Sequence, residues 1–357
     1  MAVLNEEQTM LRYMAREWTT NESPVTAWRK VRDGNEPAGY DASVYGEMAQ
    51  MGWTGIIIPE AHGGSEFGWL SMGLVTEELG KTVTASPLSA SAATASAIVL
   101  GGSDAQKAEW LPGIASGEVV ATLAVDEGPR HDPSKISASV TGGKLSGTKA
   151  FVAEGDSAGL FVVAAADGLY LVAGDAAGVS RSRRQLTDFR SHAEVTFTDA
   201  PAERLAGGGD TLLDQVLDRA AVLAAAEMLG LAGQAFDTTL AYLKQRVQFG
   251  QVLSTFQALQ HRMANLFSDI ELMRSAVEAG LAALDSGGDT RQAASLAKAK
   301  ANEVGHLMSR EVIQLHGGIG MTDEYDAGFY LKRMRVLEQM WGNTAYHRER
   351  FARLSGY

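Results

Sequence analysis

Long helical periods fill the last part of the chain and limit what it can fold into. Apolar residues recur there at helical spacing, and alanine, which favours helix intrinsically, is abundant. The periodic segments span about residues 210–245, 254–284, 291–313 and 326–354. We therefore predict a helical bundle over residues 206–357, beginning at a run of three glycines.

The middle of the chain has a shorter period. A β-prone run at 119–125 is followed by alternation of apolar and serine residues over 136–140, as in a half-buried strand. Asp167-Gly168 is a hairpin-turn signal. We expect residues 118–205 to form a small antiparallel barrel or sandwich.

The first part of the chain again shows helical spacing, for example at Leu4, Leu11 and Met14. The predicted fold class is therefore α+β and mostly α. It comprises an N-terminal helical domain (1–117), a central antiparallel β-barrel or sandwich (118–205) and a C-terminal helical bundle (206–357).

Composition narrows the function. The chain has 357 residues, a formal net charge of −12 and no cysteine. The acidic balance argues against nucleic acid as the main partner, because phosphate binding requires a basic face. Without cysteine there is no thiolate metal site or cysteine nucleophile, and the histidines lack metalloprotease spacing, so we expect no metal. We see no signal peptide and no apolar run of membrane-spanning length, and we expect a cytoplasmic protein without membrane contact.

Two short segments carry the strongest functional signal. Gln314 and Leu315 precede His-Gly-Gly-Ile-Gly at the end of a predicted helix, and Arg246 follows an earlier one. Adjacent glycines such as Gly317 and Gly318 let backbone N–H groups approach an anion closely, and an arginine adds a fixed cation with several donors. The simpler alternative is a glycine helix stop, with the arginine as a solvated cation.

Five segments resemble acyl-CoA dehydrogenases in the same order along the chain. They are Met51–Gly55, Pro59–Gly64, Leu145–Val152, Tyr242–Gln257 and Gln314–Gly320. The resemblance covers nearly the whole chain and implies the three-part fold described above. It also implies FAD-dependent α,β-desaturation of an acyl-CoA thioester, with an acceptor such as electron-transferring flavoprotein.

The resemblance assigns the ADP half of FAD to residues of the C-terminal bundle. These are Arg246, Phe249, Gln257, Gln314, Leu315, Gly317 and Gly318, with Thr344 as a further cofactor contact.

The catalytic base is where the sequence departs from the family. One family position lies in a Glu-Gly-Thr-type motif, where this chain has Gly342 in place of the glutamate, although Thr344 is retained. Other members carry the base just before an arginine, which here gives Asp218 and Arg219. Aspartate is one methylene shorter than glutamate, and reach matters for proton abstraction. Asp218 as base and Arg219 as substrate contact are therefore a hypothesis, with a structural carboxylate as the alternative.

The flavin-ring contacts depart as well. The family's Thr-Glu-Pro-x-x-Gly-Ser-type run corresponds to residues 125–132, which lack the hydroxyl pair. The Trp-x-Thr-type contact corresponds to Phe151–Ala153, where Ala153 has no hydroxyl. An ADP site beside a poor ring site and a missing base is expected of the small β-type subunit of an α2β2 heterotetramer. The α partner would supply the ring contacts and the base, and the resemblance implies bulky acyl groups, including steroid side chains.

Three alternatives remain at this point. The chain is a self-sufficient homotetrameric dehydrogenase with Asp218 as base, a flavin-free structural subunit, or a monooxygenase of the same fold.

Overall fold

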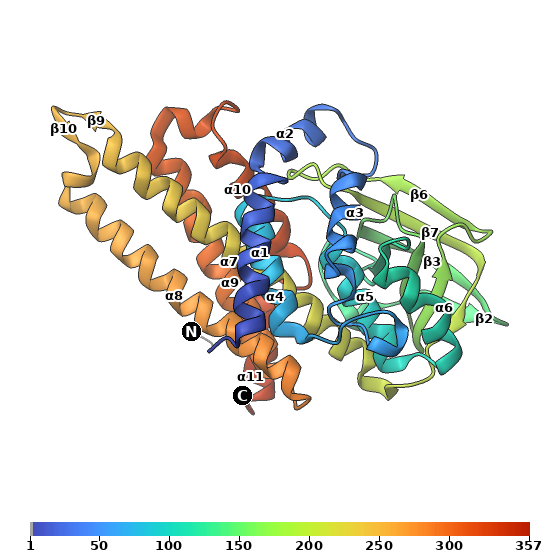
Figure 1. Cartoon of the computed structure of the whole chain (residues 1–357). Coiled ribbons are helices and arrows are strands. Elements are labelled where there is room, and N and C mark those ends of the chain that lie inside the picture. Colours follow the sequence, from blue (N-terminus) through green and yellow to red (C-terminus); the bar gives the residue numbers. More distant parts are fainter. Residues whose placement is uncertain (1–2) are drawn as a thin grey trace. The chain divides into compact units, whose positions relative to one another are not determined.

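The computed structural model describes residues 3–357, which form two compact units (Figure 1). The helical unit joins the N-terminal segment up to Thr26, residues Gly73–Thr84 and the chain from Ala224 onwards. The β-unit joins Ala27–Met72 and Ala85–Leu223. Each unit draws on separated stretches of sequence, and the division into three contiguous domains stays a prediction.

The helical unit contains the predicted bundle. Its helices are α1 (Glu6–Asn21), the later parts of α4 (Gly68–Lys81) and α7 (Leu212–Gln245), α8 (Gln257–Ser286), α9 (Arg291–His316), α10 (Ala327–Gln339) and α11 (Thr344–Leu354). The last predicted segment is two helices, because positive φ angles at Trp341 and Gly342 interrupt it. Within residues 3–357, no helix is both long and apolar enough to cross a bilayer.

Small residues let α4 and α7 approach closely in the helical unit. A Cβ on Gly230 would collide with the carbonyl of Glu77, and one on Gly80 would collide with the carbonyl of Glu227. Glu227 also accepts two hydrogen bonds from the guanidinium of Arg333 on α10, at 2.7 and 2.9 Å. Close backbone packing and this buried ion pair fix α7 against its neighbours.

The β-unit contains helices and two four-stranded sheets. The helices are most of α2 (Val25–Asp33), α3 (Ala42–Gln50), α5 (Leu88–Gly101) and α6 (Asp104–Ala115). One sheet has the order β1 (Ala121–Ala124), β4 (Leu160–Ala165), β5 (Gly168–Ala173), β8 (Glu203–Arg204). The other has the order β2 (Ser139–Thr141), β3 (Lys144–Ala153), β7 (His192–Pro201), β6 (Val179–Arg183).

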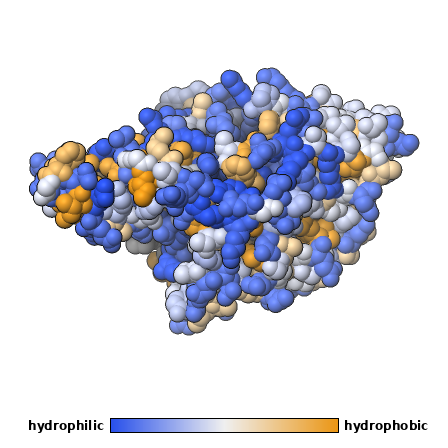
Figure 2. Space-filling view, turned by 90° about the horizontal axis from the view of Figure 1, so that it is seen from above, coloured by the Kyte–Doolittle hydropathy of each residue, from blue (hydrophilic) through white to orange (hydrophobic). Residues whose placement is uncertain are grey.

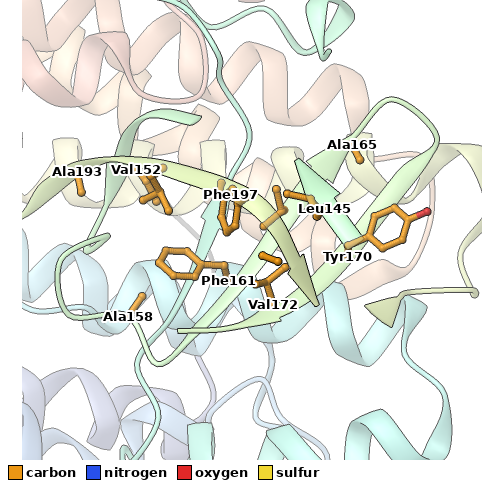
Figure 3. Close-up of a cluster of buried hydrophobic side chains, with 13 residues drawn as sticks. Leu145, Val152, Ala158, Phe161, Ala165, Tyr170, Val172, Ala193 and Phe197 are labelled. Atoms are coloured by element: carbon orange, nitrogen blue, oxygen red, sulfur yellow. The ribbon is translucent and has the colours of Figure 1, made fainter. Parts of the chain in front are cut away.

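The two sheets share one apolar core and form a sandwich rather than a closed barrel. Phe161 of β4 meets Phe197 of β7 edge-to-face, with ring centroids 5.8 Å apart (Figure 3). The mostly antiparallel expectation is confirmed, but β1 and β4 pair in parallel. Strand alternation cannot reveal such a pair, because it shows which face is apolar and not which strands meet.

Candidate cofactor site

The ends of α7 and α9 meet in the helical unit. Arg246 directly follows α7, and Gly317 and Gly318 directly follow α9. The hydroxyl of Tyr242, one turn before Arg246, donates to the carbonyl oxygen of His316 at 3.3 Å. The structure thus brings together the arginine and the glycines that the sequence singled out. We call Arg246, Gln314, Gly317 and Gly318 the cradle.

The two glycines of the cradle leave their backbone open to approach. Gly317 has a φ of +63°, a region that favours glycine. No atom lies within 4 Å of where a Cβ would stand on Gly317 or Gly318, and both residues are exposed. The N–H of Gly317 closes the end of α9 by bonding to carbonyls of that helix. What the glycines add is therefore space for an anion to reach the backbone beside the exposed Arg246.

A short hairpin adds apolar surface beside the cradle. Strands β9 (Val247–Gln248) and β10 (Gln251–Val252) are antiparallel, with Phe249 at the turn. Phe249 is 88% exposed, and its ring stands 6.2 Å from that of Phe256. Figure 2 shows apolar side chains gathered at the left end of the view, which carries the β9–β10 label in Figure 1. A large exposed aromatic of this kind is typical of a contact with another molecule.

The other predicted contacts divide between surface and interior. Gln314 lies on the last turn of α9 and Gln257 is the first residue of α8, and both are exposed. Leu315 is buried and packs in the interior of the bundle. Its side chain is therefore not presented to a ligand.

Thr344 lies elsewhere on the bundle. It is the first residue of α11, and the carbonyl of Gly342 just before it accepts a hydrogen bond from Asn302 Nδ2 at 3.2 Å. Asn302 precedes Gly317 by roughly four turns of α9, or about 20 Å along the helix. The structure does not bring Thr344 to the cradle.

The position where the family motif would carry glutamate is crowded. Gly342 is buried with a φ of +103°, and a Cβ there would overlap the rings of Tyr346 and His347. The Nε2 atom of His347 lies 2.8 Å from the carbonyl oxygen of Trp341. A side chain at Gly342 therefore requires the rings of Tyr346 and His347, on α11, to move.

A buried lysine on α9 is hydrogen-bonded to the same loop. Lys298 Nζ donates to Asn302 Oδ1 at 2.7 Å and to the carbonyls of Leu337 and Gly342 at 2.9 and 3.1 Å. Burial lowers the pKa of Lys298 to about 7, and the Glu338 carboxylate opposes that shift. Lys298 therefore fixes the loop between α10 and α11 at two points, the end of α10 at Leu337 and the loop residue Gly342.

Asp218 and Arg219 lie in the part of α7 that belongs to the β-unit. The Asp218 side chain is fully buried (0% exposed). Arg219 donates to the carbonyl of Gln215 at 2.8 Å and stands 5.5 Å from the ring of Trp69. Burial lowers the pKa of Arg219, and the charge of Asp218 opposes the shift. The roles of base and substrate contact for this pair remain predictions.

Comparison with known proteins gives the chain its relatives. Residues 5–118 match the family model for the acyl-CoA dehydrogenase N-terminal domain, and residues 207–355 match that for the C-terminal domain. Acyl-CoA dehydrogenase IpdE2 of Mycolicibacterium smegmatis is 30% identical, with 95% of this chain and 96% of that protein covered. The chain belongs to the acyl-CoA dehydrogenase family.

Two further relatives agree with this assignment. Acyl-CoA dehydrogenase FadE34 of Mycobacterium tuberculosis is 32% identical over 96% of this chain, which spans about half of that relative's length (47%). The solved Tcur3481-Tcur3483 steroid ACAD, in a variant form, is 32% identical with a TM-score of 0.92, covering 98% of each chain. Family membership supports an oxidoreductase acting on acyl-CoA, with FAD as its cofactor.

Residues 125–132 correspond to the family's ring-binding run, and their carboxylates are hydrogen-bonded to other residues of this chain. Asp126 Oδ2 lies 3.0 Å from His131 Nδ1. Glu127 accepts from the buried Lys149 at 2.7 Å and from the backbone N–H of Ser137 at 2.8 Å. Burial would raise the pKa of Glu127, but these hydrogen bonds lower it to about 2. The carboxylates of Asp126 and Glu127 are thus hydrogen-bonded within the chain.

The second ring-binding segment is also changed from the family pattern. Phe151 is exposed, with a φ of +51°. The carbonyl of Ala153 accepts a hydrogen bond from the hydroxyl of Thr122 at 2.6 Å. The cradle fits the ADP half of FAD, whereas this part of the β-unit lacks the side-chain hydroxyl that would bond the flavin ring.

Lys298 and Tyr242, which hold the segments described above, were not among the predicted site residues, although Tyr242 opens the segment Tyr242–Gln257. Lys298 gave no signal, because a lysine on an alanine-rich helix is typical of a solvated face. Tyr242 lies one helical turn before Arg246, a spacing that was the one available hint. Within residues 3–357, no group of three or more His, Cys, Asp or Glu is placed to hold a metal ion.

Proposed function

We propose that this chain is the subunit of a heteromeric acyl-CoA dehydrogenase that holds the ADP half of FAD. A partner subunit supplies the flavin-ring contacts and the catalytic base. One contrast carries the proposal: the cradle is open at Gly317, whereas at Gly342, the position of the family's base, the space for a side chain is filled by the rings of Tyr346 and His347. A chain that has kept a nucleotide site and lost a base is suited to sharing a cofactor.

In this proposal this chain binds the ADP half of FAD, and its partner supplies the residues that react with the acyl-CoA. Bound FAD would supply the hydride acceptor for the β-hydrogen of the acyl group. Arg246 neutralises negative charge on the diphosphate of its ADP half, and the glycines allow close backbone approach. The exposed Phe249 beside the cradle contributes to the surface that the partner covers.

The substrate class rests on similarity. A steroid ACAD is among the similar solved structures, and its double name, Tcur3481-Tcur3483, is compatible with a paired arrangement. We therefore propose a bulky acyl-CoA, such as one with a steroid side chain, as substrate. We further propose cytoplasmic location and electron-transferring flavoprotein as the electron acceptor.

The second candidate is a self-sufficient homotetramer with Asp218 as its base. Its support is that IpdE2 aligns with this chain over nearly the full length of both. The third candidate is a flavin-free structural subunit. It requires that changes in the cradle have no effect on flavin content in any assembly.

Native mass and flavin absorbance separate these candidates. The chain is purified alone, and then after co-expression with a neighbouring dehydrogenase-like chain. We expect little flavin on the chain alone and about one FAD per pair in the co-expressed complex. A yellow homotetramer with one FAD per chain would instead establish the second candidate, and a colourless complex would establish the third.

A further inference from the structure

A buried histidine, His316, directly precedes the first glycine of the cradle. The ring of His316 contacts the rings of two tyrosines, with centroids 4.4 Å from Tyr242 and 4.7 Å from Tyr325, and these two rings lie 6.4 Å from each other. The chain also turns back against this residue, since a Cβ on Gly320 would stand 2.9 Å from the Cβ of His316. His316 is therefore enclosed by α7, by its own helix and by the segment after it.

The hydrogen bonds of His316 fix its orientation as well as its position. Nδ1 lies 2.6 Å from the carbonyl of Val312, an acceptor only, so Nδ1 carries the proton. Nε2 lies 3.1 Å from the hydroxyl of Tyr325, which can donate to it. Burial lowers the pKa of His316, and the Val312 bond opposes the shift, so the neutral form suits this arrangement. The backbone carbonyl of His316 is bonded in turn by the hydroxyl of Tyr242.

These contacts connect the two halves of the cradle. His316 is the residue before Gly317, and Tyr242 is one turn before Arg246. The backbone of each half is tied to its own helix, since the Arg246 N–H bonds to the Tyr242 carbonyl at 2.9 Å and the Gly317 N–H bonds to carbonyls of α9, but these bonds do not fix one half relative to the other. A binding site gains affinity when such groups are ordered before the ligand arrives.

We propose that His316, clamped by Tyr242 and Tyr325, is a positioning residue that sets the spacing between Arg246 and the Gly317–Gly318 step. It thereby sets the affinity for the diphosphate of the ADP half. The inference rests on the proposed cradle and adds to it a residue that touches no ligand.

Conservative changes to the tyrosines test this role without removing a ring. Tyr325→Phe removes only the bond to Nε2, and Tyr242→Phe removes only the bond to the His316 carbonyl. The probe is ADP, titrated into the purified chain and followed by ligand-observed NMR. We expect each variant to weaken ADP binding about 2- to 10-fold, the range expected for one neutral hydrogen bond. Because the Tyr325 hydroxyl acts through the His316 ring, adding Tyr325→Phe to His316→Leu should weaken binding less than the separate effects predict.

Tyr330→Phe is the matched control. Its hydroxyl donates at 2.9 Å to the carbonyl of Lys81, on α4 of the same unit, and not to His316 or a residue of the cradle. It removes a bond of the same kind, so it should lower the melting temperature similarly and leave ADP binding unchanged. If Tyr330→Phe weakens ADP binding as much as Tyr325→Phe does, the effect is general stability and the positioning role is overturned.

A cradle variant distinguishes failure of this inference from failure of the proposed function. If Gly317→Val weakens ADP binding and both tyrosine variants bind like the wild type, only the positioning role of His316 is lost. If Gly317→Val binds normally, or the wild-type chain binds no ADP at millimolar concentration, both the cradle and this inference are lost.

Discussion

Gly317 and Gly342 each follow a long helix of the same bundle, and both have positive φ angles, yet their surroundings are opposite. Around Gly317 the space for a Cβ is open, and Arg246 stands at the same end of the bundle. Around Gly342 that space is filled by the rings of Tyr346 and His347. The comparison teaches that glycine serves access at one site and dense packing at the other. A glutamate at Gly342 would therefore need the rings of Tyr346 and His347 to move as well.

The largest effect is expected from Gly342→Glu. Strain at positive φ costs about 1–3 kcal/mol, and forcing atoms into a packed region costs about 1–3 kcal/mol more. We therefore expect the free energy of unfolding, measured with urea, to fall by about 2–6 kcal/mol in total, with no gain of dehydrogenase activity in the chain alone. A stable Gly342→Glu variant with new activity would show that the loop has room for a base.

Removing the lysine beneath that loop should change how stability depends on pH. The pKa of Lys298 is about 7 in the folded chain and near its ordinary value of 10.5 when unfolded. Between these values the unfolded chain binds more protons, so this group makes the free energy of unfolding rise with pH above about 7. Lys298→Met should lose that rise in urea titrations between pH 6 and pH 9.

Lys300→Met is the control for Lys298→Met. Lys300 lies two residues further along α9 and pairs with Asp269 at 3.4 Å. It should keep the rise in stability with pH. An unchanged pH dependence in Lys298→Met would contradict the assignment of that rise to the buried amine.

Gly317→Val tests the open side of the comparison. The valine side chain would block approach to the backbone, so we expect FAD occupancy of the complex to fall at least about tenfold, a loss of roughly 1.4 kcal/mol in binding. The flavin-to-protein absorbance ratio measures it. Gly287→Val is the control for a valine at another open helix end, since Gly287 has a φ of +69° and open surroundings at the end of α8, although its ψ of +10° strains a side chain less than the −139° of Gly317. Equal flavin content in the two variants would rule out the cradle.

The smallest effect is expected from Asp218→Asn in the assembled complex. If the partner carries the base, kcat should be essentially unchanged, whereas loss of a general base costs roughly 10²–10⁴-fold. Steady-state kinetics with a saturating acyl-CoA decide between these values. A fall of that size, with flavin still bound, would return catalysis to this chain.

The sequence by itself determined much of the architecture. Helical period and alanine content predicted the bundle, and alternation with turn signals predicted the two-sheet region, because the spacing of apolar residues dictates which face each element buries. The motif around Gly317 and the arginine at 246 also singled out, without coordinates, the two segments that form the proposed cradle. These features are local, and local spacing is what a sequence records directly.

Only the tertiary structure decided which distant segments meet. It paired β1 with β4 in parallel and made the β-region a sandwich. It also buried Asp218 and Leu315. Thr344, at the start of α11, lies beside the part of α9 around Asn302 and not beside the cradle. The tertiary structure also showed that Tyr346 and His347 fill the space at Gly342. Such outcomes depend on contacts between residues far apart in the chain, and a residue's own sequence neighbourhood does not contain the atoms that will surround it.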